Sequence, residues 1–151
     1  MFPMKILSTM FMGDKILIDD GDVELVVKDK KDGRLELEAA NPGEIKNRKS
    51  INVPGASIQL KSLSEKDRGF IDFAIENNLD FIAHSFVRNK EDVMTIQKIL
   101  DDRNSKIKII AKIENQEGVS NIDEILDHVY GVMVARGDLG IEIEAEKIPR
   151  I

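Results

Sequence analysis

The stretch "KIIAKIENQEG" (residues 108–118) holds the pattern that decides the fold of this 151-residue chain. It begins as an apolar run and ends in opposite charges, with Lys112 and Glu114 two positions apart. Side chains two positions apart on a strand point to the same side of the sheet. The stretch therefore predicts a buried strand whose last polar side chains can converge on one ligand.

Similar apolar runs lie on both sides of this strand, and helical patterns separate them. Strands are predicted at 80–87, 106–114 and 131–138, and helices at 64–78, 91–102 and 119–128. This order predicts a parallel sheet covered by helices on both faces. The strands recur about every 25 residues, near the unit length of an α/β barrel, although an open doubly wound sheet fits this period equally well. No G-x-G-x-x-G motif follows any of the strands.

The first part of the chain has the short alternating runs of an antiparallel sheet. Strands are predicted at 15–21, 23–29 and 34–40, followed by a loop at 41–50 and a junction at 51–55. Gly33 lies between the second and third strands, which predicts a hairpin. Asp19, Asp20 and Gly21 are interpreted as a turn in preference to a metal-binding loop. The change of pattern predicts two domains, residues 1–50 and 51–151.

The composition excludes several classes of function. Hydrophobic residues make up 42% and charged residues 33% of a chain with net charge −6 and no cysteine, which is typical of a globular protein. The lack of cysteine excludes disulfides and a cysteine nucleophile and fits a cytoplasmic enzyme. The chain has no basic block and few aromatic residues, so we expect no nucleic-acid partner. The apolar opening stretch is too short to span a bilayer, so we expect no membrane association.

Polar side chains lie at the end of each strand of the predicted parallel sheet, where such folds carry their chemistry. They are His84, Ser85 and Arg88 in the first group, Lys112, Glu114 and Asn115 in the second, and Arg136 and Asp138 in the third. Two carboxylates, Glu114 and Asp138, beside Lys112 suit a magnesium ion and a phosphate or enolate. The spacing fits ion pairs at the end of the sheet equally well. His84 is interpreted as a hydrogen-bonded core residue, and His128, at a helix end, is given no chemical role.

Several motifs together resemble the pyruvate kinase family. "NVPG" (52–55), "SEKD" (64–67), "AHSFVR" (83–88), "KIIAKIENQEG" (108–118) and "GVMVARGDLGIEI" (131–143) occur in the order and spacing of that family. The resemblance extends over nearly the whole chain. It implies an α/β fold in which residues 51–151 form three βα units of a (β/α)8 TIM barrel. Residues 1–50 would be the later part of a small β-barrel lid domain.

The resemblance also implies a reaction and its residues. Pyruvate kinases transfer a phosphoryl group from phosphoenolpyruvate to ADP in glycolysis, giving pyruvate and ATP, with Mg²⁺ or Mn²⁺ and usually K⁺. Lys112 would stabilise the transferred phosphoryl group and the enolate. Glu114 and Asp138 would hold the divalent metal, and the amides of Gly137 and Asp138 would meet the substrate carboxylate. Ser85 and Arg136 would support this site.

The resemblance further predicts that the chain is a fragment. The family's potassium ligands, substrate arginine and downstream threonine segment are not found in this sequence, so we expect the chain alone to be inactive. The full-length enzyme would be a homotetramer, and the fragment would associate through open β-edges. One alternative is a Mg²⁺-dependent carbon–carbon lyase acting on pyruvate or phosphoenolpyruvate, against which the lid-like hairpin and the paired motifs argue. The other is a non-catalytic module that associates through its β-edges.

Overall fold

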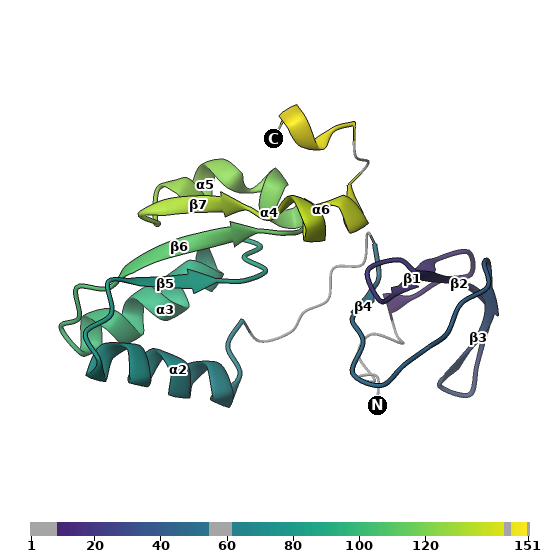
Figure 1. Cartoon of the computed structure of the whole chain (residues 1–151), viewed down its shortest axis with the longest axis horizontal. Coiled ribbons are helices and arrows are strands. Elements are labelled where there is room, and N and C mark those ends of the chain that lie inside the picture. Colours follow the sequence, from purple (N-terminus) through teal and green to yellow (C-terminus); the bar gives the residue numbers. More distant parts are fainter. Residues whose placement is uncertain (1–8, 55–61, 144–145, 151) are drawn as a thin grey trace. The chain divides into compact units, whose positions relative to one another are not determined.

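A computed structural model describes residues 9–54, 62–143 and 146–150 of the chain (Figure 1). The chain forms two compact units, Met1–Gln59 and Leu60–Ile151. The first is built on an antiparallel sheet and the second on a parallel sheet with helices. The predicted domain boundary lies between residues 50 and 51, nine residues before this division, and it stays a prediction.

The first unit contains a four-stranded antiparallel sheet in the order β3-β2-β1-β4. Its strands are β1 (Lys15–Ile18), β2 (Val23–Lys31), β3 (Arg34–Ala39) and β4 (Ile51–Asn52). The three predicted strands and the loop at 41–50 are confirmed. The stretch interpreted as a junction instead contributes β4, which pairs with β1; Gly55 at its end lies outside the described residues. The core consists of Met10, Ile16, Ile18, Val23, Val27 and Val53.

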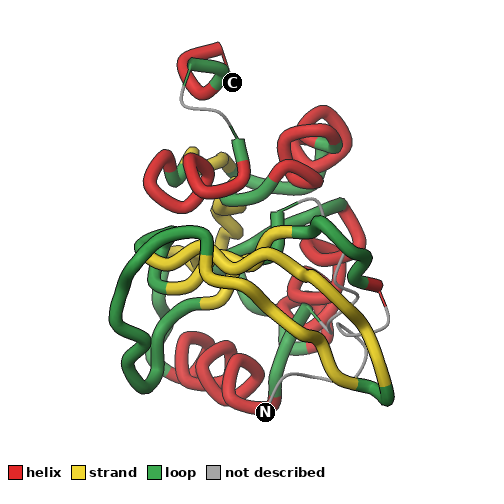
Figure 2. The backbone as a smooth tube through the Cα atoms, turned by 90° about the vertical axis from the view of Figure 1, so that its right-hand side faces the viewer, coloured by secondary structure: helices red, strands yellow, loops and turns green. Residues whose placement is uncertain are grey.

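Two tight turns connect the strands of this sheet. Asp32 and Gly33 join β2 to β3, the long hairpin visible in Figure 2, with φ values of 51° and 70°. Positive φ at both positions is what a two-residue type I′ loop requires, and Asp-Gly is a preferred pair for it. Asp19 and Asp20 also have positive φ, and Asp19 pairs with Lys49 at 2.7 Å. The interpretation of residues 19–21 as a turn is therefore confirmed.

The second unit has a parallel sheet of three strands in the order β5-β6-β7. Along the chain the elements are α2 (Glu65–Glu76), β5 (Phe81–His84), α3 (Lys90–Asp102), β6 (Lys108–Ile113), α4 (Gln116–Ser120), α5 (Ile122–Leu126), β7 (Gly131–Val134), α6 (Arg136–Glu142) and η1 (Ile148–Arg150). The predicted alternation of helices and strands is confirmed. None of the described helices has the length and apolar character needed to cross a membrane.

Helix α2 begins where the sequence predicts, because Ser64 and Asp67 form a capping box. The Asp67 amide donates to Ser64 Oγ at 3.2 Å, and the Ser64 amide donates to Asp67 Oδ2 at 2.8 Å. These bonds satisfy amides that have no partner within the helix. The same contacts lower the pKa of the Asp67 carboxyl, because hydrogen bonds from Ser64 favour its ionised form.

Two predicted elements have different bounds. The helix predicted at 119–128 begins at Gln116 and is divided into α4 and α5 at Asn121. The strand predicted at 131–138 ends at Val134, so the prediction that Arg136 and Asp138 belong to its tip is wrong. Strand β6 provides ladder partners only as far as Ile113, so residues 136–142 form α6 and bury Leu139 instead.

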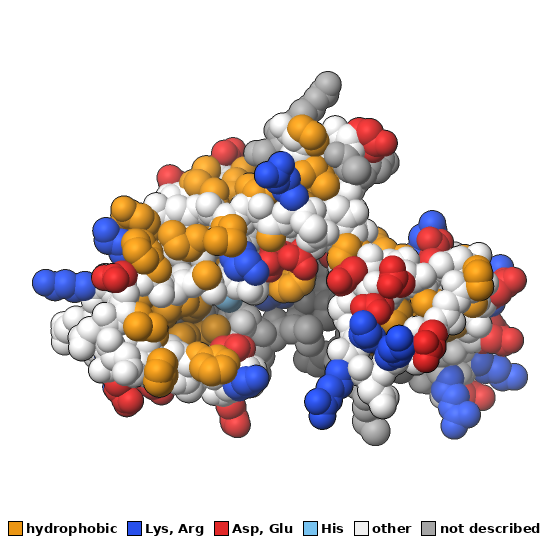
Figure 3. Space-filling model, viewed as in Figure 1, with side chains coloured by type: hydrophobic (Ala, Val, Ile, Leu, Met, Phe, Trp, Pro, Cys, Tyr) orange, Lys and Arg blue, Asp and Glu red, His pale blue; other side chains and the backbone are white. Residues whose placement is uncertain are grey.

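Helices cover one face of the parallel sheet. Ile109, Ala111 and Ile113 of β6 pack there with side chains of α2, α3 and α5, including Ile71, Ala74, Val93, Ile96, Leu100 and Ile125. Alternation places Lys108, Ile110 and Lys112 on the opposite face. On this face, Phe81 of β5 pairs with Lys108 and is 50% exposed, and Met133 of β7 pairs with Lys112 and is 48% exposed. Hydrophobic side chains are visible over these strands in Figure 3. Within the described residues, the predicted helix cover is thus found on one face only.

Candidate functional site

The carboxyl ends of β5 and β6 are joined by hydrogen bonds from the loop that follows β5. The Phe86 amide donates to Glu114 Oε2 at 2.7 Å, and the Val87 amide donates to the Lys112 carbonyl at 3.4 Å. Phe86 has a φ of 56°, a left-handed conformation that is unusual for a large aromatic residue. This turn directs a backbone N–H group from the end of one strand onto the carboxylate that follows the next strand.

Lys112 and Glu114 form the charged centre of this region. Lys112 Nζ contacts Glu114 Oε1, as the two-residue spacing predicts, and also lies 3.2 Å from Ser85 Oγ. The Glu114 side chain is only 1% exposed, whereas the Lys112 side chain is 25% exposed. A buried carboxylate is stable only when it is paired and hydrogen-bonded. Ser85, Lys112 and Glu114 therefore form one connected group that is accessible through the partly exposed lysine and the exposed serine.

The start of α4, which directly follows Glu114 and Asn115, holds the loop after β5 in place beside this group. Asn115 Oδ1 accepts a 2.7 Å hydrogen bond from the Gly118 amide, and Asn115 Nδ2 donates to the Val87 carbonyl at 3.3 Å. A Cβ atom at Gly118 would lie only 2.4 Å from the Val87 carbonyl oxygen. Glycine at position 118 thus allows the loop after β5 to approach α4 closely.

Arg88, also named among the polar residues after β5, is occupied by an ion pair. Its guanidinium contacts both carboxylate oxygens of Asp92, from Nε to Oδ2 at 2.9 Å and from Nη2 to Oδ1 at 2.8 Å. Asp92 is buried in the first turn of α3. Its hydrogen bond and charge raise the pKa of Arg88 above the ordinary arginine value. We therefore assign Arg88 to the structural connection between β5 and α3.

The third group of predicted site residues lies on α6, which follows β7 after a single residue. Arg136, Gly137 and Asp138 form its first turn, and Asp138 is partly buried. Helix α6 reaches the start of α4, where the Gln116 amide donates to Glu142 Oε2 at 3.0 Å. Among the described residues, no group of three or more His, Asp or Glu side chains is arranged to hold a metal ion. The structure thus brings Lys112, Glu114 and Ser85 together, and within the described parts of the chain no contact joins Asp138 to them.

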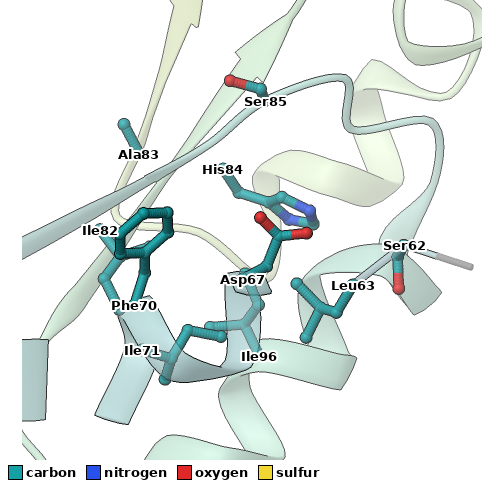
Figure 4. A pocket seen from close by; sticks show the side chains of 10 residues that line it. All are labelled: Ser62, Leu63, Asp67, Phe70, Ile71, Ile82, Ala83, His84, Ser85 and Ile96. Atoms are coloured by element: carbon teal, nitrogen blue, oxygen red, sulfur yellow. The ribbon is translucent and has the colours of Figure 1, made fainter. Parts of the chain in front are cut away.

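His84 lines a pocket of about 260 Å³ between β5, α2 and α3, and Ser85 of the charged group lines it as well (Figure 4). The apolar side chains of Leu63, Phe70, Ile71, Ile82 and Ile96 form half of its lining residues, and Asp67 lies near the imidazole. His84 is buried and hydrogen-bonded to the backbone of Ser62, as predicted, whereas its Nδ1 atom has no hydrogen-bond partner among the described residues. Burial lowers the pKa of His84, since desolvation disfavours the imidazolium form.

Two contributors to the charged centre could not be found from residue types. The backbone amide of Phe86 has no signature in the sequence, because its role depends on the positive φ. The close approach at Gly118 is also invisible, because it joins segments more than 25 residues apart. The capping role of Asn115 had a usable signal, since asparagine is favoured immediately before a helix.

Alternating strands and helices, with ionisable side chains grouped at the ends of parallel strands, define an α/β domain of the kind that carries catalytic sites. The family described as "Pyruvate kinase, barrel domain" matches residues 3–151. The chain therefore belongs to the pyruvate kinase family.

Curated relatives agree with this assignment. The chain is 56% identical over 138 residues to the protein named "Pyruvate kinase" of Borreliella burgdorferi. This alignment covers 91% of the chain and 29% of that relative. It is 46% identical over 148 residues to the "Pyruvate kinase" of Staphylococcus epidermidis and 49% identical over 149 residues to that of Geobacillus stearothermophilus. Each of these two alignments covers 97% of the chain and 25% of the relative. The chain thus spans about a quarter of the length of the curated relatives it matches.

Proposed function

We propose that this chain is part of a cytoplasmic pyruvate kinase that transfers a phosphoryl group from phosphoenolpyruvate to ADP in glycolysis. The observation that carries the proposal is the group of Ser85, Lys112 and Glu114 at the carboxyl ends of adjacent parallel strands. Family membership supplies the reaction, and this group supplies a cation and a carboxylate where the reaction needs them.

We further propose that the second unit is a part of a (β/α)8 barrel made of three βα units, with residues 1–50 as the later part of a lid. The parallel order β5-β6-β7 and the helix cover on one face support this architecture. The opposite face, which carries Lys112, would line the inside of the barrel. The assignment of residues 51–151 to the barrel domain is part of the same proposal.

Glu114 and Asp138 are proposed as ligands of a Mg²⁺ or Mn²⁺ ion. Carboxylate oxygens are the ligands that these hard cations prefer, and the metal is commonly held by one or two carboxylates together with substrate oxygens. The hydrogen bond from the Phe86 amide keeps the Glu114 carboxylate in one orientation. When bound, the metal supplies positive charge that stabilises the phosphate oxygens. Ligands for K⁺ are proposed to lie outside this chain.

The remaining residues would bind and orient the substrate. The Lys112 ammonium would stabilise the negative charge on the transferred phosphoryl group and on the enolate, which is then protonated to pyruvate. Ser85 would hold that ammonium through its hydroxyl group. The amides of Gly137 and Asp138 lie in the first turn of α6, where amides have no acceptor within the helix, and would meet the substrate carboxylate. Arg136 would support them from the same turn.

The activity is proposed for the longer protein, a homotetramer, and not for this chain alone. The chain spans about a quarter of its curated relatives, and the proposed K⁺ ligands and further substrate-binding residues are expected outside it. We therefore expect no turnover of phosphoenolpyruvate and ADP above background in a coupled assay of the isolated chain. Turnover at an ordinary kinase rate would show that the site is complete without those parts.

The metal site can be tested directly with Mn²⁺, whose binding is followed by the loss of its free electron paramagnetic resonance signal. We expect this chain to bind Mn²⁺, and Glu114→Gln to weaken binding by about tenfold or more because a ligand charge is lost. Asp123→Asn is the matched control, since Asp123 is an exposed acidic residue of α5. Equal weakening by both variants would indicate a general charge effect and would contradict a specific site.

A further inference from the structure

We infer that Lys112 is a built-in counter-ion that competes with the divalent metal for Glu114 and becomes available to an anionic ligand only when the metal displaces it. This inference rests on the proposed role of Glu114 as a metal ligand. It adds a coupling between the two functional side chains, namely that metal binding at Glu114 and anion binding at Lys112 favour each other.

The contacts of Glu114 are the first step of the argument. Its Oε2 accepts the hydrogen bond of the Phe86 amide, and its Oε1 contacts the Lys112 ammonium. No other basic side chain contacts Glu114 within the described parts of the chain. Because the carboxylate is almost completely buried, its charge needs a compensating cation. In this structure Lys112 provides that charge.

The second step concerns what changes when a dication approaches the carboxylate. The Phe86 amide is uncharged and can remain on Oε2 while a metal binds, whereas an ammonium and a dication on the same carboxylate repel each other. Lys112 already lies 3.2 Å from Ser85 Oγ and is partly exposed, so it has a second partner and room to move. Metal binding would therefore shift Lys112 from Glu114 toward Ser85 and solvent.

The third step is the consequence for an anion. While Lys112 is paired with Glu114, its charge is largely neutralised and it attracts a phosphate weakly. Once a metal neutralises Glu114, the ammonium on the open face of β6 is free to bind phosphate. Linkage requires the effect to be mutual, so an anion at Lys112 must also tighten metal binding at Glu114. The chemical class recognised is a phosphate or phosphate ester together with a divalent cation.

The test replaces Lys112 by a neutral side chain and measures Mn²⁺ binding by electron paramagnetic resonance and thermal unfolding. For Lys112→Met we expect about fivefold tighter Mn²⁺ binding, because the competing cation is removed. We also expect a lower unfolding temperature in EDTA than for the unchanged chain and a larger upward shift on adding Mn²⁺, because the metal then supplies the only charge opposite Glu114. With inorganic phosphate present, the unchanged chain should bind Mn²⁺ more tightly, and Lys112→Met should lose this gain.

Lys108→Met is the matched control. Lys108 lies on the same strand and face as Lys112, but its ammonium lies over the Tyr130 ring, 4.0 Å from the centroid. Its replacement should leave Mn²⁺ affinity unchanged. Lys112→Gln keeps an N–H donor for Glu114 and should show the same gain in affinity if Lys112→Met folds poorly.

The possible outcomes distinguish failure of the competition between Lys112 and the metal from failure of Glu114 as a metal ligand. Mn²⁺ binding that is equal or weaker in both Lys112 variants would overturn the competition while leaving Glu114 as a metal ligand. An equal gain in Lys108→Met would assign the effect to net charge and would also overturn it. If neither the unchanged chain nor the variants bind Mn²⁺, the proposed metal role of Glu114 fails and the inference fails with it.

Discussion

The charge of His84 is governed by its surroundings more than by its own chemistry. Burial lowers its pKa, while Asp92, the Ser62 backbone and Asp67 act in the opposite direction and Arg88 lowers the pKa further. Loss of hydration dominates this balance, so the imidazole is expected to be neutral at neutral pH. In that form Nδ1 or Nε2 can act as a hydrogen-bond acceptor, and Nδ1 has no partner among the described residues.

A lowered histidine pKa predicts loss of stability in acid. As pH falls below the ordinary histidine value of about 6.5, the unfolded chain takes up a proton before the folded chain does. The contribution of His84 is therefore present above that value and is lost as pH falls through the lower folded pKa. His84→Gln should flatten the decrease in unfolding free energy over this range, measured by urea denaturation. His128→Gln, at an exposed histidine, is the matched control. A flattened slope in both variants would show that acid sensitivity does not come from His84.

At the scale of secondary-structure elements, the site depends on how closely the loop after β5 approaches α4. The Val87 amide donates to a carbonyl of β6, and the Phe86 amide donates to the carboxylate of Glu114, which follows β6. The Val87 carbonyl in turn accepts a hydrogen bond from the Asn115 side chain. Gly118 has no side chain to prevent this approach. The site is therefore positioned by backbone packing between two connections that follow adjacent strands.

Two glycine substitutions should have opposite effects on stability. Gly118→Ala would place a Cβ atom 2.4 Å from the Val87 carbonyl oxygen and should destabilise the chain by about 1–3 kcal/mol. Gly69→Ala in α2 meets no atom within 4 Å and should stabilise the chain by up to about 1 kcal/mol, because alanine favours helix. Urea unfolding measures both changes. A stabilising Gly118→Ala would mean that the loop after β5 can move away from α4 at no cost.

The elements differ in how much of them local sequence could predict. The start of α2 after Ser64 and the hairpin turn at Gly33 depend on residues close in sequence, and both lie where the sequence predicts them. The end of β7 was placed four residues too late, because it depends on where β6 stops offering partners and on the burial of Leu139. The Lys112–Glu114 contact follows from strand alternation, but the Phe86 amide depends on a backbone angle and a partner 28 residues away.

At the scale of the whole molecule, the parallel sheet has strand edges and apolar surface that no other described residue covers. In the parallel sheet, β5 and β7 each have one neighbour among the described strands, so each presents an edge. The face that carries Phe81 and Met133 is also partly open. Unpaired strand edges and exposed apolar faces favour pairing with another chain. Self-association of the isolated chain is therefore expected.

Light scattering over a range of protein concentrations should show this association. Met133→Lys places a charge on the open face of β7 and should reduce the apparent mass at high concentration. Leu126→Lys is the control, because Leu126 on α5 is 47% exposed, close to the 48% of Met133. A chain that stays monomeric at all concentrations would contradict the prediction. Equal suppression by both variants would show that net charge, and not the open face, governs association.

Side chains along β6 alternate between the two faces of the sheet, which limits the insertions and deletions that this strand can accept. Removing one codon before Lys112 would move the ammonium to the helix-covered face and bring Ile113 to the open face, because successive strand residues alternate. The β2–β3 hairpin has no such constraint at its tip, where Asp32 and Gly33 are exposed and turn back without burying a side chain. Single-residue insertions and deletions should therefore be tolerated at the hairpin and should be damaging within β6.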